Sequence, residues 1–275
     1  MNFTTFYFSG TGNTEWAVKQ FHQKIKEKGH RGEMIPIERK DILESSFLEN
    51  IFLESDYIGF ANPIYGANIP PIMRLFIERV VLFAADNKEY SKPIYIINTF
   101  GYINGFGPFA AKKLFSNTGL KLISYLNIKL CNNISTPRIK TNGISMDKLE
   151  LRKKKAVIKL GKMIDILLAG KKHITGIGPY LIPGIIIRKK SQKGIMDNYK
   201  VLSVQKESCS LCMLCVNKCP ANSIIYKDNC FQFLPSCTAC MRCYNNCPAN
   251  SILFDKIYAD PTIYKRYRGP ENNKI

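Results

Sequence analysis

The sequence FTTFYFSGTGNT, residues 3–14, decides the fold of the first half of the chain. It begins with a short apolar and aromatic run typical of a buried strand. Residues 9–14 then combine two glycines with hydroxyl side chains and lead into a segment with helical spacing, residues 13–28. Such a loop favours a phosphate site, because backbone N–H groups, hydroxyls and the helix dipole meet an anion there. The alternative is a plain strand-to-helix turn.

The motif differs from two better-known phosphate-binding loops. It is not a P-loop, since no Gly-Lys-Ser/Thr follows, and it is not a dinucleotide fingerprint, since G-x-G-x-x-G is absent. Alternation of strands and helices continues to about residue 170. Interleaved elements of this kind predict βαβ units with right-handed crossovers, so we expect an α/β fold with a doubly wound, five-stranded parallel sheet. Further strands are expected at 34–37, 57–60, 94–98 and 122–128, and further helices at 71–83, 109–116 and 147–169.

Two later loops follow central strands of the predicted sheet. Residues 62–68 read NPIYGAN and residues 99–105 read TFGYING. Ligands of doubly wound sheets bind at the carboxyl ends of strands, and both loops offer aromatic rings together with glycines. Taken alone, Tyr65 or Tyr102 is as easily explained as an ordinary surface or core residue. Three such loops in order instead predict a flat ligand that carries a phosphate.

Two cysteine blocks lie 28 residues apart, CSLCMLCVNKCPANSI at 209–224 and CTACMRCYNNCPANSI at 237–252. Eleven of the 16 positions are identical, which indicates an internal duplication. Each block reads C-x2-C-x2-C-x3-C-P, and in two-cluster ferredoxins the fourth cysteine of each block ligates the other cluster. We therefore expect two 4Fe–4S clusters, one on Cys209, Cys212, Cys215 and Cys247 and one on Cys237, Cys240, Cys243 and Cys219.

Structural zinc is the alternative for these cysteines, since paired C-x2-C elements also bind zinc. A third evenly spaced cysteine and a trailing Cys-Pro are unusual for a zinc site. Cys131 and Cys230 fall outside the pattern and receive no role.

The phosphate loop and the two later loops resemble those of flavodoxins over roughly residues 1–170, and the whole chain resembles flavodoxin–ferredoxin fusion proteins, the ferrodoxins. The resemblance implies the sheet order 2-1-3-4-5, non-covalently bound FMN and a small α+β two-cluster ferredoxin-like domain. It divides the chain into a flavodoxin-like domain (1–170), a basic connector (171–200), the ferredoxin-like domain (201–258) and a tail (259–275). The residues that it assigns to FMN are Ser9, Gly10, Thr11, Gly12, Asn13, Thr14, Pro63, Tyr65, Gly66, Thr99, Phe100, Gly101 and Tyr102.

The chain is strongly basic, with a formal net charge of +19. Between residues 148 and 193 there are 13 Lys or Arg against two acids. This stretch is a solvated helix face with a charged linker, or it docks to redox partner proteins with acidic surfaces, or it makes a peripheral contact with an anionic membrane. No nucleic-acid module is recognisable, so no nucleic-acid partner is expected. No apolar run is long enough to span a bilayer and no leader precedes the first strand, so we expect a cytoplasmic protein.

Electron transfer between the two clusters and FMN, serving redox partner proteins in an anaerobic type of metabolism, is the function that these features predict. The alternative is an FMN-dependent iron–sulfur oxidoreductase that reduces a small organic substrate. The flavin loops contain no histidine or carboxylate, which favours the carrier, and no catalytic residue is assigned. A redox-sensing regulator would need a DNA- or protein-binding module, and the sequence offers none.

Overall fold

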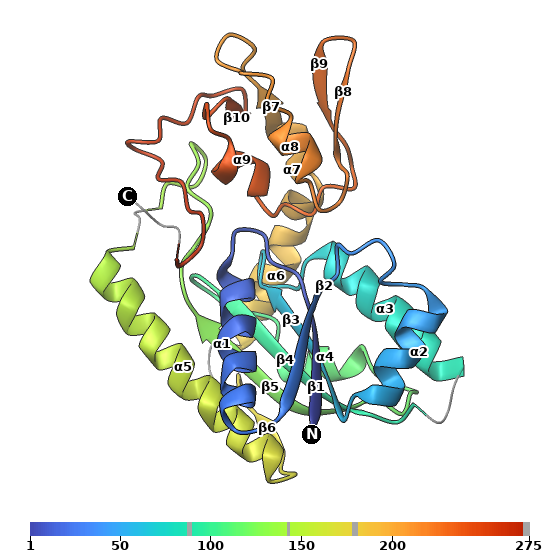
Figure 1. Cartoon of the computed structure of the whole chain (residues 1–275). Coiled ribbons are helices and arrows are strands. Elements are labelled where there is room, and N and C mark those ends of the chain that lie inside the picture. The colour runs from blue at the N-terminus through green and yellow to red at the C-terminus, as the bar shows by residue number, and fades with distance from the viewer. Residues whose placement is uncertain (87–89, 142–143, 178–180, 272–275) are drawn as a thin grey trace.

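A parallel six-stranded sheet forms the larger part of the molecule in the computed structural model, which describes residues 1–86, 90–141, 144–177 and 181–271 (Figure 1). Its order is β2-β1-β3-β4-β5-β6, so the flavodoxin-like order 2-1-3-4-5 is confirmed. The number of strands was wrong by one. The additional strand, β6, pairs with only Ser124 and Tyr125 of β5 and is too short to carry a hydrophobic period. The strands are β1 Asn2–Tyr7, β2 Arg31–Pro36, β3 Tyr57–Pro63, β4 Pro93–Phe100, β5 Lys121–Lys129 and β6 His173–Ile174.

Helices cover both faces of this sheet, so its central strands are apolar on both sides. Every residue of β3 is buried. One face packs on α1 Asn13–Glu27 and α5 Met146–Leu168. The other face packs on α2 Ser45–Glu54, α3 Pro71–Asp86 and α4 Pro108–Lys113. Of these helices, α2 was not expected from the sequence, although its Leu48, Ile51 and Phe52 are buried.

The stretch predicted as a basic connector, residues 171–200, is largely helical. This stretch contains α6 Leu181–Met196 and the short α7 Asn198–Val201. The sequence of α6, LIPGIIIRKKSQKGIM, is apolar in its first half and basic in its second, so it shows no helical period. The Ser191 hydroxyl anchors α6 to the sheet domain by donating to the Gly66 carbonyl at 2.6 Å.

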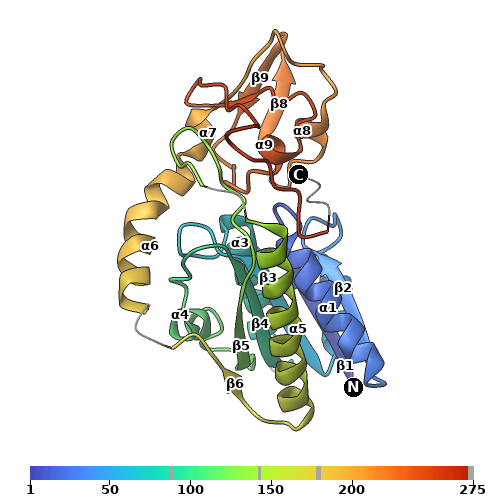
Figure 2. The ribbon, with the colours of Figure 1, turned by 90° about the vertical axis from the view of Figure 1, so that its left-hand side faces the viewer.

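A small module of short antiparallel strands and helices follows and lies over the carboxyl ends of the sheet strands (Figure 2). In it β7 pairs with β10, and β8 pairs with β9. Its compact core includes Leu202, Tyr244 and Phe254. The elements are β7 Leu202–Val204, α8 Leu214–Asn217, β8 Ile224–Lys227, β9 Cys230–Phe233, α9 Arg242–Asn246 and β10 Ile252–Phe254.

The segment after β10 returns to the sheet domain. The Tyr267 hydroxyl donates to the Asn13 side-chain oxygen, and Tyr267 is buried. The next residue, Arg268, donates from Nε to the Asn245 carbonyl at 3.0 Å. This segment therefore ties the start of α1 to the cysteine-rich module. Within the described part of the chain, no helix has the length and hydrophobicity needed to cross a membrane.

Candidate functional site

A cavity of about 320 Å³ lies where the carboxyl ends of β1, β3 and β4 meet. The sequence-predicted FMN residues line it, with the exception of Gly12, which faces a neighbouring cavity. A volume near 300 Å³ is at the small end of ligand-binding cavities. The predicted residues that line it are Ser9, Gly10, Thr11, Asn13, Thr14, Pro63, Tyr65, Gly66, Thr99, Phe100, Gly101 and Tyr102.

The loop at residues 9–14 leaves backbone N–H donors free at the start of α1. The Ser9 hydroxyl oxygen accepts the backbone N–H groups of Gly12 and Glu15, each at 3.2 Å, and so fixes the loop onto the first turn of α1. Within the described residues, the backbone N–H groups of Thr11, Asn13 and Thr14 have no acceptor. Three free donors at the positive end of a 15-residue helix suit a phosphate group.

The second and third loops form the remaining walls. The Thr99 hydroxyl lies 2.8 Å from that of Thr14 and joins the third loop to the loop at residues 9–14. Tyr65 is buried on the inner wall, whereas Tyr102 is 58% exposed at the mouth. Burial raises the pKa of Tyr65 well above its usual value, so its phenol stays protonated.

Sequence reasoning missed two parts of the cavity wall. Asn132 and Asn133 come from the loop after β5, and Ile187 comes from α6. The sequence does indicate a role for Asn132 and Asn133, because β5 ends at the same edge of the sheet as β3 and β4. The neighbouring Cys131 is buried, which raises its thiol pKa to about 11, and its carbonyl accepts the Asn13 side-chain N–H at 2.9 Å. Nothing in the sequence indicated that Ile187 would reach this cavity.

The eight patterned cysteines gather around two small cavities in the cysteine-rich module. Each cavity takes three cysteines from one block and the fourth from the other block. Among the described residues, no three Cys, His, Asp or Glu side chains converge in the way that holds a single metal ion. The four thiols of each set line one small cavity, an arrangement compatible with ligation of a cluster. The first set is Cys209, Cys212, Cys215 and Cys247, and the second is Cys219, Cys237, Cys240 and Cys243.

The backbone of the two blocks is curled in the same unusual way. Three residues of each block have positive φ without being glycine, which is costly and marks loops held by their surroundings. The fourth cysteines also match, because Cys219 Sγ accepts the N–H of Ser223 and Cys247 Sγ accepts that of Ser251, both at 3.3 Å. The positive-φ pairs are Leu211 and Ala239 (52° and 53°), Met213 and Met241 (55° and 58°), and Asn222 and Asn250 (48° and 52°).

Burial raises the pKa of four of these eight thiols, those of Cys215, Cys237, Cys240 and Cys243. It raises the pKa of Cys240 to about 12 and that of Cys215 to about 11. Ligation requires thiolates, so iron would supply the charge that stabilises them. Cys230 lies at the start of β9 and lines neither cavity.

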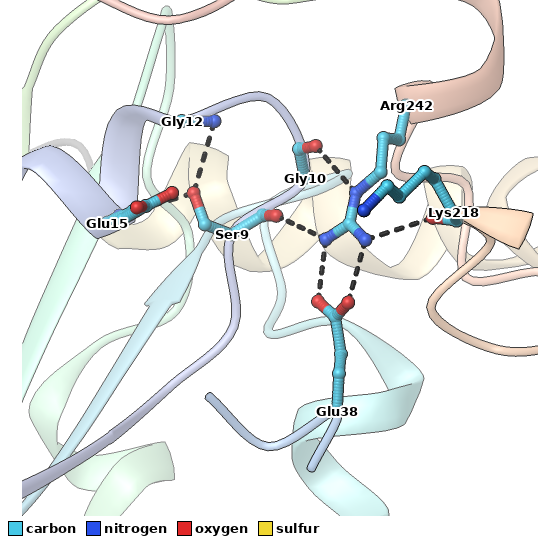
Figure 3. Close-up of polar contacts among 7 residues, drawn as sticks. All are labelled: Ser9, Gly10, Gly12, Glu15, Glu38, Lys218 and Arg242. Atoms are coloured by element: carbon cyan, nitrogen blue, oxygen red, sulfur yellow. Dashed lines mark hydrogen bonds and ion pairs between the residues drawn. The ribbon is translucent and has the colours of Figure 1, made fainter. Parts of the chain in front are cut away.

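Arg242, at the start of α9, joins the second block to the loop at residues 9–14 (Figure 3). Its Nη2 donates to the Ser9 carbonyl at 2.7 Å and its Nε donates to the Gly10 carbonyl at 3.1 Å. The same guanidinium pairs with both carboxylate oxygens of Glu38, at 2.6 and 2.7 Å, and donates to the Lys218 carbonyl at 3.0 Å. A larger cavity, of about 540 Å³, opens beside this contact between the two modules.

Cys240 of the second block is packed into the sheet domain. A Cβ atom added at Gly10 would lie 2.2 Å from the Tyr65 hydroxyl oxygen and 2.9 Å from the Cys240 carbonyl oxygen, so only glycine fits between them. The Asn133 side chain donates to the same Cys240 carbonyl at 3.2 Å. Gly10, Tyr65 and Asn133 all line the 320 Å³ cavity. The second set of thiols therefore lies directly behind a wall of that cavity.

The sequence matches no protein-family model and no curated protein. Among solved structures the chain is similar to the flavodoxin of Megasphaera elsdenii, with 16% identity, a TM-score of 0.39 and coverage of 57% of this chain and 98% of that one. It is also similar to the flavodoxin of Streptococcus pneumoniae (18%, 0.42, 62% and 99%) and to an archaeal flavodoxin (14%, 0.39, 60% and 99%). The strand order and the converging loops, rather than these distant similarities, establish a flavodoxin-like fold for the N-terminal domain.

Proposed function

We propose that this flavodoxin-like chain is an electron-transfer protein that carries FMN in the 320 Å³ cavity and two 4Fe–4S clusters in the cysteine-rich module. The observation that carries the proposal is the position of Cys240, which shares the wall formed by Gly10, Tyr65 and Asn133 with the flavin cavity. When bound, the clusters accept single electrons and FMN accepts one or two. The chain would therefore couple one-electron transfer to two-electron transfer.

The residues of the cavity fit FMN at both of its ends. The free N–H groups at Thr11, Asn13 and Thr14 would hold the phosphate. The wall made by Tyr65 and the glycines at 66 and 101 suits a flat ring system, because it combines an aromatic surface with backbone that can approach closely.

The two sets of thiols fit cubic clusters for a separate reason. Their crossed grouping, their matched left-handed residues and the N–H groups directed at Cys219 and Cys247 are those of loops wrapped around a bulky anionic group. The second set lies behind the flavin cavity, while Cys212 of the first set is exposed. We infer that external redox proteins meet the first set and that the second set exchanges electrons with FMN.

The cavity supports a carrier better than an enzyme that reduces a small organic substrate. Its described lining contains no histidine and no carboxylate. An enzyme of that kind needs a placed acid or base beside the reacting atoms.

Anaerobic purification followed by iron, sulfide, zinc and flavin analysis tests the proposal. We expect about eight irons and eight sulfides per chain, as two four-iron cubes require, and one FMN released on denaturation. Two zinc ions without iron would refute the clusters, and apoprotein that fails to bind micromolar FMN would refute the flavin.

A variant pair makes the flavin test specific. Thr11→Ala removes a buried hydroxyl that has no protein partner among the described residues. We expect it to weaken FMN binding about 10- to 100-fold, because a hydrogen bond to a charged group contributes roughly 1.5–3 kcal/mol. The matched control is Thr118→Ala, which removes a hydroxyl just before β5, at the opposite edge of the sheet, and should leave FMN affinity unchanged.

A further inference from the structure

Two buried hydroxyl groups beside the second set of thiols have no hydrogen-bond partner among the described residues. Thr238, between the first two cysteines of the second block, is 2% exposed and lines the same cavity as the second set. Tyr65 is 6% exposed and stands in the wall between Cys240 and the 320 Å³ cavity. A buried donor without an acceptor is costly. Both positions therefore call for an acceptor that the chain alone does not supply.

The Tyr65 hydroxyl lies on the Cys240 side of this wall. Its oxygen is closed off from solvent, although the residue lines the cavity. A Cβ atom added at Gly10 would lie 2.2 Å from that oxygen and 3.2 Å from Cys240 Cβ, so Tyr65 and Cys240 meet at this glycine. The neighbouring Asn133 directs its amide N–H at the Cys240 carbonyl at 3.2 Å and is itself a donor. The nearby group that can become a strong acceptor is the Cys240 sulfur.

Ligation of a cluster would create the missing acceptors, because a thiol is a weak donor whereas a thiolate only accepts. We propose that the hydroxyls of Tyr65 and Thr238 donate hydrogen bonds to sulfur atoms of the second cluster and thereby raise its reduction potential. Such bonds raise a potential because they stabilise the reduced state, which carries more negative charge. The inference rests on the clusters proposed above and assigns these two residues to tuning one of them.

Two serines at equivalent positions of the blocks differ in the same sense. The Ser223 hydroxyl lies 3.1 Å from the sulfur of Cys219, which belongs to the second set. Its counterpart Ser251 directs its hydroxyl at the Ala249 carbonyl, at 3.4 Å, rather than at Cys247 of the first set. The same residue type thus gives a hydroxyl contact to the second set and none to the first.

Water provides for the first set what these hydroxyls provide for the second. Cys212 is exposed, and so is Ser210, which is the counterpart of Thr238. Burial by itself lowers the reduction potential of a cluster, because reduction adds negative charge where water is excluded. The buried hydroxyls would offset this effect and keep the potential of the second cluster close to that of the first. An electron that enters at the exposed first cluster can then move on to the cluster beside the 320 Å³ cavity.

The test is a redox titration of the anaerobically purified full-length protein, followed by electron paramagnetic resonance of the reduced clusters. Tyr65→Phe removes one hydroxyl and Thr238→Val replaces the other with a methyl group. Each variant should lower one of the two cluster potentials and leave the other nearly unchanged. We expect about a tenfold change in the one-electron reduction equilibrium, which corresponds to about 59 mV.

Two control variants make the same chemical changes elsewhere. Tyr57→Phe removes a buried phenol oxygen at the start of β3, where it donates to the Leu167 carbonyl at 3.0 Å, and should shift neither potential. Ser210→Ala should shift a potential much less than Thr238→Val does, because water replaces its exposed hydroxyl. Combining Tyr65→Phe with Cys247→Ala, which lacks a thiol of the first set, should preserve the shift.

The outcomes separate this inference from the proposed function. Protein that holds about eight irons but shows wild-type potentials in both Tyr65→Phe and Thr238→Val would overturn the inference and leave the clusters in place. Loss of the Tyr65→Phe shift in the Cys247→Ala background would assign the hydroxyl to the first cluster and would also overturn it. Protein that takes up no iron would refute the proposed function itself, and this inference with it.

Discussion

The two cysteine blocks are near copies of each other in sequence and opposites in surroundings. In the first block Leu211 is 52% exposed and Cys212 is exposed. At the equivalent positions of the second block, Ala239 is 3% and Cys240 is 7% exposed. The cysteines, the prolines and the curled backbone are the same in both, so the difference arises from what each block faces.

The positions at which the copies differ lie mainly where the second block meets the sheet domain. Leu214 corresponds to Arg242, which donates to the Ser9 and Gly10 carbonyls. Val216 corresponds to Tyr244, whose hydroxyl donates to the Ser135 carbonyl at 2.7 Å. The cysteine pattern thus specifies the thiol cavities, and the residues between the cysteines specify which block is docked and which faces solvent.

Of the predictions on the two blocks, we expect the largest effect from substituting a fourth cysteine. We expect Cys247→Ala to lose the cluster over the first block, and with it about half of the iron, because this thiol belongs to the first cavity. Iodoacetamide labelling with peptide mass spectrometry should then modify Cys209, Cys212 and Cys215. Cys230→Ala is the control and should keep the full iron content. Labelling of the second block in Cys247→Ala would contradict the crossed arrangement.

Tyr244→Val makes the second block resemble the first at a fully buried position. The ring is 0% exposed, the hydroxyl bonds Ser135, and the Arg266 guanidinium lies 3.8 Å from the ring centroid. Loss of buried volume and of a hydrogen bond should lower the free energy of unfolding by about 3 kcal/mol. The reverse change, Val216→Tyr, should alter it by less than about 1 kcal/mol. Denaturant titration of both variants measures this, and equal effects would remove the distinction between the blocks.

Arg242→Leu tests the clamp that Arg242 forms on the loop at residues 9–14. The change removes the bonds to the Ser9 and Gly10 carbonyls and leaves Glu38 without its partner. The two charged side chains are 16% and 28% exposed, so solvent already weakens their interaction. We expect the free energy of unfolding to fall by about 2 kcal/mol. Leu214→Arg should change stability by less than about 0.5 kcal/mol. FMN affinity should fall in Arg242→Leu alone, and a fall of the same size in both variants would argue against the clamp.

Local sequence patterns were sufficient to predict a doubly wound parallel sheet and the edge at which the three loops meet. Apolar runs and glycine-containing loops carry that information within a few residues, as at residues 3–14. The strand order came from the resemblance of the loops to those of flavodoxins. The sixth strand and α6 were missed because a two-residue strand and a helix divided along its length have no recognisable period.

Contacts between distant parts of the chain could not be read from local patterns. Arg242 looks like a surface residue in the sequence, and only the fold brings it to Ser9, 233 positions earlier. Tyr267, in the segment bounded as a tail, contacts Asn13 from 254 positions away. The cysteine spacing, by contrast, repeats a local motif, and the two thiol cavities contain the residues that it grouped.

The most direct test of the central claim, that the second block serves FMN within one chain, is rapid reduction of the clusters followed by the flavin absorbance. Because Cys240 lies against the wall of the 320 Å³ cavity that we propose for FMN, flavin reduction should proceed at a rate independent of protein concentration, and Arg242→Leu should slow it. A rate that rises in proportion to protein concentration would contradict the claim, because electrons would then pass between molecules.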